Sequence, residues 1–559
     1  MGAEVPVSRR VGSRKSRSGC KTCKIRRVKC GEEKPTCHRC SSTGRRCEYE
    51  GDETSPRGST TPPSLSPSQA LSLSPNSGQR ERRAFEYYFQ HAAKYLAGGM
   101  AIDFWTGVVP QLCRTEPAVW DSMIAISSLY EHPDQCTDFT LLRARETSSH
   151  NMNSSLQEAL AWYSRSISNI HSQIERGKAD PYIALISCVL FICIETIQGR
   201  MEEALQLYKQ GVTLILDLRT QVSLGEVSAT KAALLEHTMI PLFLRLGTIS
   251  LTISDVQPTE VFALVEQETN PSTFESLSSA RSAITILSME IILFDREARM
   301  HLYAVGGEAF VSQEMLARKQ SFQTQLDGWV RAYNSYCQTI SDKSYPLGVE
   351  PILLSYHAAA SISLSGCLTY SETVFDAHIA HFTTIVEQAD LALTTSAGPD
   401  GSQPPFTFEM GVGIPLFLTS MKCREPNLRQ RALQLLLQAP PMQGFFKCTP
   451  VALLAGNIMK LEEHYARTMR EMRSEQQSSD NTYKAVPLPT TPELIPAEAR
   501  VSFCGVFRPA TGFPPSITEF DVARWGRGPD QLFLHYSRQI FDTNSKTWQQ
   551  VPEIVPLEA

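Results

Sequence analysis

Six cysteines near the start of the chain constrain its fold more than any other feature of the sequence. They follow the pattern Cys20-x2-Cys23-x6-Cys30-x6-Cys37-x2-Cys40-x6-Cys47. Each cysteine of the first half recurs 17 residues later, so the stretch repeats one C-x2-C-x6-C unit. A repeated unit of this kind predicts two equivalent metal sites.

The number of cysteines predicts how the metals are bound. Structural zinc takes four ligands in a tetrahedron, so six thiolates serve two zinc ions only if two sulfurs bridge both ions. The symmetric candidates for the bridges are Cys20 and Cys37, the first cysteine of each half. We therefore expect two zinc ions as cofactors and all six cysteines as ligands, with nearby basic residues offsetting the surplus negative charge.

Other uses of these cysteines fit the pattern less well. A zinc ribbon built on the two C-x2-C pairs would leave Cys30 and Cys47 without a role. A disulfide framework would suit a secreted chain, and we expect no secretory signal because the first 19 residues have no apolar core. His38 is a conceivable ligand, but six sulfurs already complete the site, so we expect it at the surface.

Positive charge is concentrated around the cysteines. Residues 1–50 hold 14 Lys and Arg against 5 Asp and Glu, whereas the whole chain has a net charge of −5. Between Cys23 and Cys30 four of six residues are basic, and the matching stretch of the second half has two. This end of the chain is suited to a polyanion.

The cysteine spacing, the basic first loop and Lys34-Pro35 together resemble the binuclear zinc cluster of fungal transcription factors. The resemblance implies a short helix in each half, bridging by the first and fourth cysteines, and a first helix that enters the major groove over a CGG-type triplet. Arg26 and Arg27 fall where the family's base-contacting residues lie. Pro35 matches a position where the family often has a cis-proline turn.

We assign DNA contacts on charge and chemistry. The planar guanidinium of arginine can donate twice to guanine O6 and N7, so base reading is assigned to Arg26 and Arg27. Phosphate contact is assigned to Lys21, Lys24 and Lys29. The expected partner is double-stranded DNA, and the expected location is the nucleus.

The composition divides the rest of the chain. We expect a basic disordered arm at 1–18, the zinc cluster at 19–49 and a linker at 50–81, since residues 51–79 hold eleven Ser and Thr, five Pro and no aromatic residue. This linker cannot form a heptad coiled coil, so a homodimer stays an open possibility. No apolar run approaches the roughly 20 residues of a membrane span, and we expect no membrane partner.

Helical periodicity dominates from residue 82 to 477, which predicts an all-α regulatory domain. Segments such as VLFICIETIQGRMEEALQLYKQG and IPLFLTSMKCREPNLRQRALQLL resemble the fungal-specific regulatory domain that follows such clusters. The resemblance covers most of residues 85 to 475. It implies contact with the transcription machinery or co-regulators, sometimes a small-molecule effector, and no enzyme fold.

Individual residues of this domain predict structure rather than catalysis. The apolar run 183–195 predicts a buried helix whose Cys188 and Cys193 are core thiols. Glu195 is expected to pair with Arg200 or to serve a helix end, rather than to bind a ligand. His378 and His381 lack an obvious third ligand and are expected to be ordinary helix residues.

The remaining segment, 478–559, mixes aromatic and charged residues and fits either a small ordered appendage or an activation segment. The resemblance implies a nuclear RNA polymerase II regulator that controls a metabolic or secondary-metabolite gene cluster, with activation favoured over repression. The alternative is a ligand-binding receptor or an enzyme at 82–559 with an accessory zinc cluster. No catalytic motif was found, so we expect no enzyme.

Overall fold

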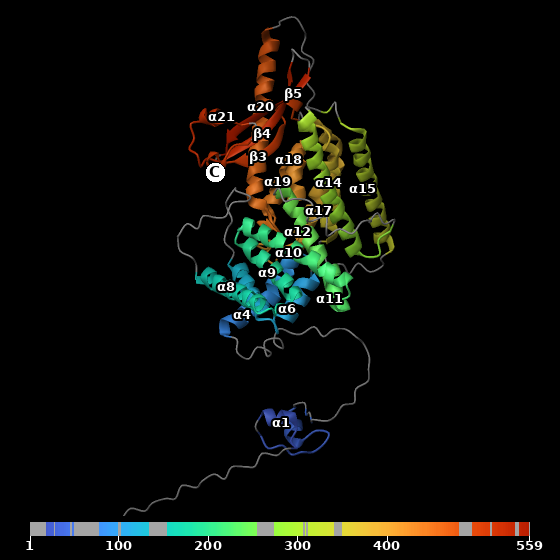
Figure 1. The fold of residues 1–559 in the computed structure, drawn as a ribbon, viewed down its shortest axis with the longest axis vertical. Helices are drawn as coiled ribbons and strands as arrows, with labels where there is room; N and C mark the ends of the chain where they lie inside the picture. Colours follow the sequence, from blue (N-terminus) through green and yellow to red (C-terminus); the bar gives the residue numbers. More distant parts are fainter. Residues whose placement is uncertain are drawn as a thin grey trace, which may run out of the picture. The chain divides into compact units, whose positions relative to one another are not determined.

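A computed structural model describes residues 18–26, 28–44, 47, 49, 78–98, 102–132, 154–253, 273–305, 308, 311–339, 349–479, 495–514, 517–542 and 547–557. The chain forms two compact units, Met1–Ser66 and Pro67–Ala559. They are called the cysteine module and the body (Figure 1).

The cysteine module contains two helices of a single turn: α1 (Lys21–Ile25) and α2 (His38–Ser41). Each helix begins directly after the first cysteine of its half, Cys20 or Cys37, and buries the second, Cys23 or Cys40. Helices this short are not stable by themselves. The cysteines at their ends and on their buried faces therefore hold them in place.

The body is mostly helical, which confirms the expected fold class. Its α-helices are α4 (Gln79–Tyr87), α5 (Ala93–Ala97), α6 (Val109–Leu112), α7 (Pro117–Glu131), α8 (Ser154–Glu175), α9 (Pro181–Ile197), α10 (Met201–Ser223), α11 (Ala229–Leu234), α12 (Ile240–Ile253), α14 (Leu277–Val305), α15 (Gln313–Thr339), α16 (Val349–Gly366), α17 (Ile379–Ser396), α18 (Gly413–Lys422), α19 (Pro426–Gln438), α20 (Cys448–Ser479) and α21 (Glu519–Ala523). Its π and 3-10 segments are η1 (Tyr88–Ala92), η2 (Asp103–Val108), η3 (Leu235–Met239), η5 (Glu372–His378), η6 (Ala497–Ala499) and η7 (Pro509–Thr511).

The apolar run 183–195 lies in α9, as predicted. Pro181 occupies the first turn, and the Asp180 side chain caps the helix by accepting the N–H of Tyr182. The helix packs on α7, α8 and α10, so it is apolar on most sides. Cys193 is fully buried, and half-buried Cys188 donates to the Leu207 carbonyl at 3.2 Å.

One hydrophobic core extends through the body, from Ala84 in α4 to Ala452 in α20. In the second half of the body, α14 packs on α12, α15 and α16, while α18 packs on α19 and α20. Figure 1 shows the first helices of the body (blue to teal) at one end and strands β3 to β5 (red) at the other.

Two stretches of the body, Ala229–Ile253 and Leu277–Leu302, are long and apolar enough to cross a membrane by length and composition. This differs from the expectation that no run approaches that length. Within the body 61% and 50% of the two apolar windows are buried. Packing against neighbouring helices therefore accounts for their apolar character.

The C-terminal segment contains an antiparallel sheet that the sequence left undecided. Its strands are β3 (Val501–Phe507), β4 (Phe533–Asp542) and β5 (Thr547–Pro556), in the order β3-β4-β5. Val501 pairs with Arg538, the register shifts between Phe503 and Gly505, and Phe533 pairs with Pro556. β5 is thus an edge strand, and it carries Pro552 and Pro556.

The sheet packs on the helices rather than standing alone. Val501, Leu534 and Tyr536 share a buried cluster with Leu454 and Ile458 of α20. Of the two alternatives expected for residues 478–559, the small ordered appendage therefore describes this part of the segment. At the other end of the body, α4 begins at Gln79, three residues before the predicted start at 82, because its polar first turn carries no apolar signal.

A small hairpin, β1 (Met442–Gln443) with β2 (Phe446–Lys447), yields a stability prediction. Gly444 in its turn has φ +53, and an added Cβ would lie 2.6 Å from the Ile249 Cδ1 atom. We expect Gly444→Ala to lower the free energy of unfolding by about 1–2 kcal/mol or more, since side chains disfavour left-handed backbone. Urea unfolding followed by circular dichroism measures this.

The matched control for the hairpin variant is Gly456→Ala. Gly456 lies inside α20, and an added Cβ would make only an ordinary contact with Leu433 at 3.7 Å. Alanine is a better helix former than glycine by about 1 kcal/mol, so this variant should be slightly more stable. Equal stability of the two variants would show that the left-handed backbone at Gly444 does not require glycine.

Candidate zinc centre and nucleic-acid interface

The six predicted cysteine ligands lie together in the cysteine module. Their sulfur atoms form two groups of four in which all sulfurs are within 4.8 Å of one another. The groups are Cys20, Cys23, Cys30 and Cys37, and Cys20, Cys37, Cys40 and Cys47. Both groups therefore contain Cys20 and Cys37, the pair that the repeat symmetry singled out as bridges.

The distances between the sulfurs fit tetrahedral zinc. A tetrahedron with Zn–S bonds of about 2.3 Å has S···S edges of about 3.8 Å. The Cys20 and Cys37 sulfurs are 3.8 Å apart, Cys20 and Cys40 are 3.7 Å apart, and Cys23 and Cys37 are 3.7 Å apart. Two groups of four thiolate donors with these edges can hold two zinc ions.

Backbone amides support the sulfurs in the same way in both halves. The N–H of Cys20 donates to the Cys30 sulfur at 3.3 Å, and the N–H of Cys37 donates to the Cys47 sulfur at 3.3 Å. These contacts are equivalent under the 17-residue repeat. Amide donors stabilise negative charge on sulfur, so the arrangement favours thiolates.

The sulfurs differ in how easily they ionise. Burial raises the pKa of Cys23 and of Cys40 to about 12. Burial also opposes ionisation of Cys37, but the N–H of Cys40 and the neighbouring thiols outweigh it and lower the pKa of Cys37 to about 6. The pKa of Cys20 is lowered against its burial in the same way, first by the N–H of Cys23. The two shared sulfurs are thus the best placed to carry charge.

The turn between the halves matches its predicted form. The Lys34–Pro35 peptide bond is cis. Glu33 accepts the N–H of His38 at 2.9 Å, at the start of α2. The His38 side chain is exposed and belongs to neither sulfur group, as expected of a surface residue.

The structure places most of the predicted DNA-contacting residues around α1. Lys21 and Lys24 are exposed and share one face of α1, opposite Cys23, and Lys29 is exposed beyond the helix. Arg26 is half-buried and donates to the Thr43 hydroxyl at 3.2 Å, which ties the two halves together. Arg27 lies outside the described residues.

Three features of this surface were missed by the sequence analysis. Thr43 is the partner of Arg26. The Tyr49 hydroxyl lies 3.7 Å from the Cys30 sulfur and donates to the Glu33 carbonyl at 3.0 Å. Ile25, on the α1 surface, is 74% exposed. Of the three, only Ile25 is recognisable in the sequence, because it is an apolar residue among basic ones. The contacts of Thr43 and Tyr49 join residues 16 or more positions apart, so no local pattern indicates them.

The body offers no second metal site of this kind within its described residues. The close groups of metal-binding side chains found there and in the module are the two cysteine groups alone. His378 and His381 have their Nδ1 atoms 3.4 Å apart, but they belong to no such group. Glu195 is buried, accepts from the Tyr163 hydroxyl at 2.7 Å and lies 3.2 Å from Arg200, which confirms the expected ion pair.

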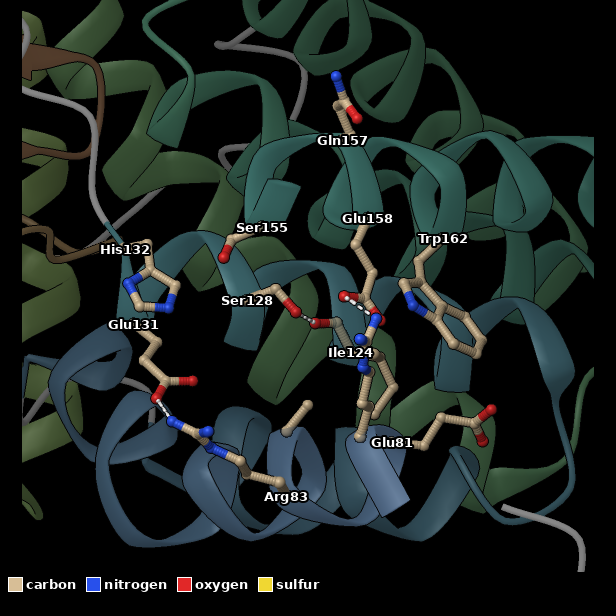
Figure 2. Close-up of a pocket in the computed structure, with 12 residues that line it drawn as sticks. Glu81, Arg83, Ile124, Ser128, Glu131, His132, Ser155, Gln157, Glu158 and Trp162 are labelled. Atoms are coloured by element: carbon tan, nitrogen blue, oxygen red, sulfur yellow. Dashed lines mark hydrogen bonds and ion pairs between the residues drawn. The ribbon is translucent and has the colours of Figure 1, made fainter. Parts of the chain in front are cut away.

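Figure 2 shows a polar groove of the body between α4, α7 and α8. Arg83 is paired with Glu131, and Arg80 with Glu158 at 3.4 Å. The groove has a volume of about 620 Å³. Its two arginines face three carboxylates, Glu81, Glu131 and Glu158, so it offers no surplus positive charge to a ligand.

Comparison with known proteins identifies the class of the cysteine module. Residues 18–55 match the family described as the Fungal Zn(2)-Cys(6) binuclear cluster domain. This segment is therefore a domain of that family, which binds two zinc ions, and the two sulfur groups fit that role.

Relatives of the chain extend beyond this domain. The chain is 23% identical over 434 residues to the aspercryptin biosynthesis cluster-specific transcription regulator of Emericella nidulans, covering 71% of the chain and 66% of the relative. It is 26% identical over 231 residues to a transcription regulator of Purpureocillium lilacinum, covering 39% and 53%. It is 30% identical over 128 residues to a Zn(2)-C6 fungal-type transcription factor of Aspergillus fumigatus, covering 22% and 34%.

The alignments span between 34% and 66% of the length of these relatives. All three relatives are named as regulators of transcription. No solved structure shows a significant match to the chain.

Proposed function

We propose that this protein is a sequence-specific DNA-binding transcription regulator that is not an enzyme. One observation carries the proposal: two four-sulfur groups share Cys20 and Cys37 and lie directly against a helix whose exposed face carries Lys21 and Lys24. A rigid metal-bound scaffold beneath basic side chains is an arrangement suited to a DNA groove.

In this proposal all six cysteines bind zinc. Cys20 and Cys37 bridge the two ions, Cys23 and Cys30 complete one tetrahedron, and the second tetrahedron is completed by the remaining pair, Cys40 and Cys47. The S···S distances near 3.8 Å support this assignment.

The DNA contacts follow from charge and position. Lys21, Lys24 and Lys29 contact phosphates, and Arg27 reads a guanine of a CGG-type triplet in the major groove. Arg26 is expected to share this task, but its Nη1 already donates to the Thr43 hydroxyl. We therefore give Arg27 the larger share of base reading.

The cellular role is proposed from the relatives. One of them is named as a regulator specific for the aspercryptin biosynthesis cluster, which supports control of a metabolic or secondary-metabolite gene cluster by this chain. The proposal includes action in the nucleus on RNA polymerase II promoters, as an activator and with co-regulators. Homodimerisation is part of the proposal, as are the arm at 1–18 and the cluster at 19–49. The linker is proposed to end before α4 begins at Gln79, and the regulatory domain to run from there to the end of α20 at Ser479, ahead of the C-terminal segment.

The test of base reading is Arg27→Ala. We expect binding to a duplex with a CGG triplet to weaken by about 1–3 kcal/mol, with loss of the preference over a scrambled duplex, since a bidentate guanine contact disappears. Fluorescence anisotropy with the full chain measures both affinities, and zinc analysis confirms that the module stays loaded.

Arg39→Ala is the matched control, because Arg39 is an exposed arginine in α2 of the second half. It should weaken binding to both duplexes about equally, if at all. Equal binding of the unmodified protein to the CGG and scrambled duplexes would overturn base reading by this module.

A further inference from the structure

A second cavity of the body has the form of a small-molecule site. It has a volume of about 330 Å³, within the range of ligand pockets. Helices α12, α14, α16 and α18 and strand β3 enclose it, and most of its wall is apolar. Representative apolar residues are Ile291, Ile292, Phe417, Met421 and Phe503.

A buried hydroxyl in this wall lacks a partner. Ser288 lines the cavity, is 5% exposed, and its Oγ atom makes no hydrogen bond. Buried helical hydroxyls usually donate to the carbonyl four residues earlier, as Thr285 and Ser361 do at 2.8 and 2.9 Å. An unpaired buried hydroxyl is destabilising, so Ser288 marks a place where a bound molecule would supply the missing partner.

Two charged residues line the cavity, and both are cations. Arg299 and Lys422 line the cavity, and no Asp or Glu does. Arg299 pairs with Asp295, and 48% of its side chain is exposed, so it lies at the mouth. Lys422 is 14% exposed and pairs with Glu372 at 2.6 Å.

The ion network behind Lys422 has a surplus of positive charge. Glu372 is shared by Lys422 and Arg424 at 2.6 and 3.2 Å. Glu462 is shared by Arg424 and Arg429 at 2.6 and 2.7 Å. Three cations thus meet two carboxylates, and a buried surplus charge of this kind attracts an anion.

We propose that this cavity binds a small amphipathic carboxylate. Its apolar part lies among the side chains of α14, α16 and α18, and its acidic group lies at Arg299 and Lys422. The polar groove of Figure 2 lacks this combination, because its wall is polar and three carboxylates line it, Glu81, Glu131 and Glu158.

The test uses decanoate as the probe, with decanol as its uncharged counterpart, and isothermal titration calorimetry on the full chain. We expect saturable one-to-one binding of decanoate and binding of decanol that is weaker by about tenfold or more, since the charge-assisted contacts are lost. No saturable binding of decanoate, or equal binding of the two probes, would overturn the proposal.

Three variants locate the site. Ala360→Leu fills the cavity and should abolish binding, and Arg299→Gln should weaken it about tenfold. Arg318→Gln is the matched control, because Arg318 is a similarly exposed arginine paired with Glu297 outside the cavity, and it should leave binding unchanged. Unchanged binding by both Ala360→Leu and Arg299→Gln would refute this location. The readout is independent of DNA binding, so either proposal can fail alone.

Discussion

Replacement of Cys20 by serine should remove both zinc ions from the cysteine module and unfold it. The Cys20 sulfur belongs to both four-sulfur groups, so its loss leaves each ion one ligand short. Structural zinc supplies about 10 kcal/mol or more of folding free energy in small domains. Zinc analysis of the full chain should find no zinc retained, and DNA binding should be lost.

Cys337→Ser is the control for this variant, because Cys337 is an exposed cysteine of α15 outside the sulfur groups. It should retain two zinc ions. The body of the Cys20→Ser variant should keep its helical circular dichroism, since it is a separate compact unit. Two zinc ions retained by Cys20→Ser would show that Cys20 does not bridge.

Replacement of Glu462 by glutamine should cost the body about 3–5 kcal/mol of stability. Glu462 is fully buried in α20 and accepts from Arg424 at 2.6 Å, from Arg429 at 2.7 Å and from the N–H of Val501 at 2.7 Å. It therefore joins α19 and β3 to α20. The neutral amide leaves two buried arginines without their shared anion.

Acid should narrow the difference in stability between the unmodified protein and the Glu462→Gln variant. Burial would raise the pKa of Glu462, but Arg424 and Arg429 outweigh burial and lower it. The carboxylate therefore contributes stability above its unfolded pKa of about 4.3, and this contribution is lost as the pH falls through the lower folded value. Urea unfolding at neutral and acidic pH measures both effects.

Glu463→Gln is the matched control for Glu462→Gln. Glu463 is the next residue of α20 and is exposed. Surface substitutions of this kind usually change stability by less than about 0.5 kcal/mol. A similar loss in both variants would mean that the buried network is not the source of the effect.

Short-range features were predictable from the sequence. The six cysteines repeat at fixed spacing, so counting ligands was enough to predict that their sulfurs lie together and that two of them are shared by both groups. The apolar run of α9 and the pairing of Glu195 with Arg200 depend on neighbours within one or two turns. Helical periodicity was enough to predict a mostly helical body.

Long-range features were not predictable in this way. Arg500 donates to Asp376, 124 positions earlier, and Tyr130 donates to the Phe406 carbonyl, 276 positions later. No local pattern indicates such partners. The cavity and the network around Glu462 arise from the same kind of distant contact. The C-terminal sheet is stabilised by packing on α20 rather than by an alternation of apolar and polar residues along its strands.

Pro552 and Pro556 lie on β5, at the outer edge of the sheet. Proline has no N–H to offer, and an incoming strand needs backbone donors in register to extend a sheet. β5 is therefore a poor template for aggregation by strand addition. Strand addition to this sheet by a second copy of the chain would therefore be expected at the other edge, β3, which carries no proline.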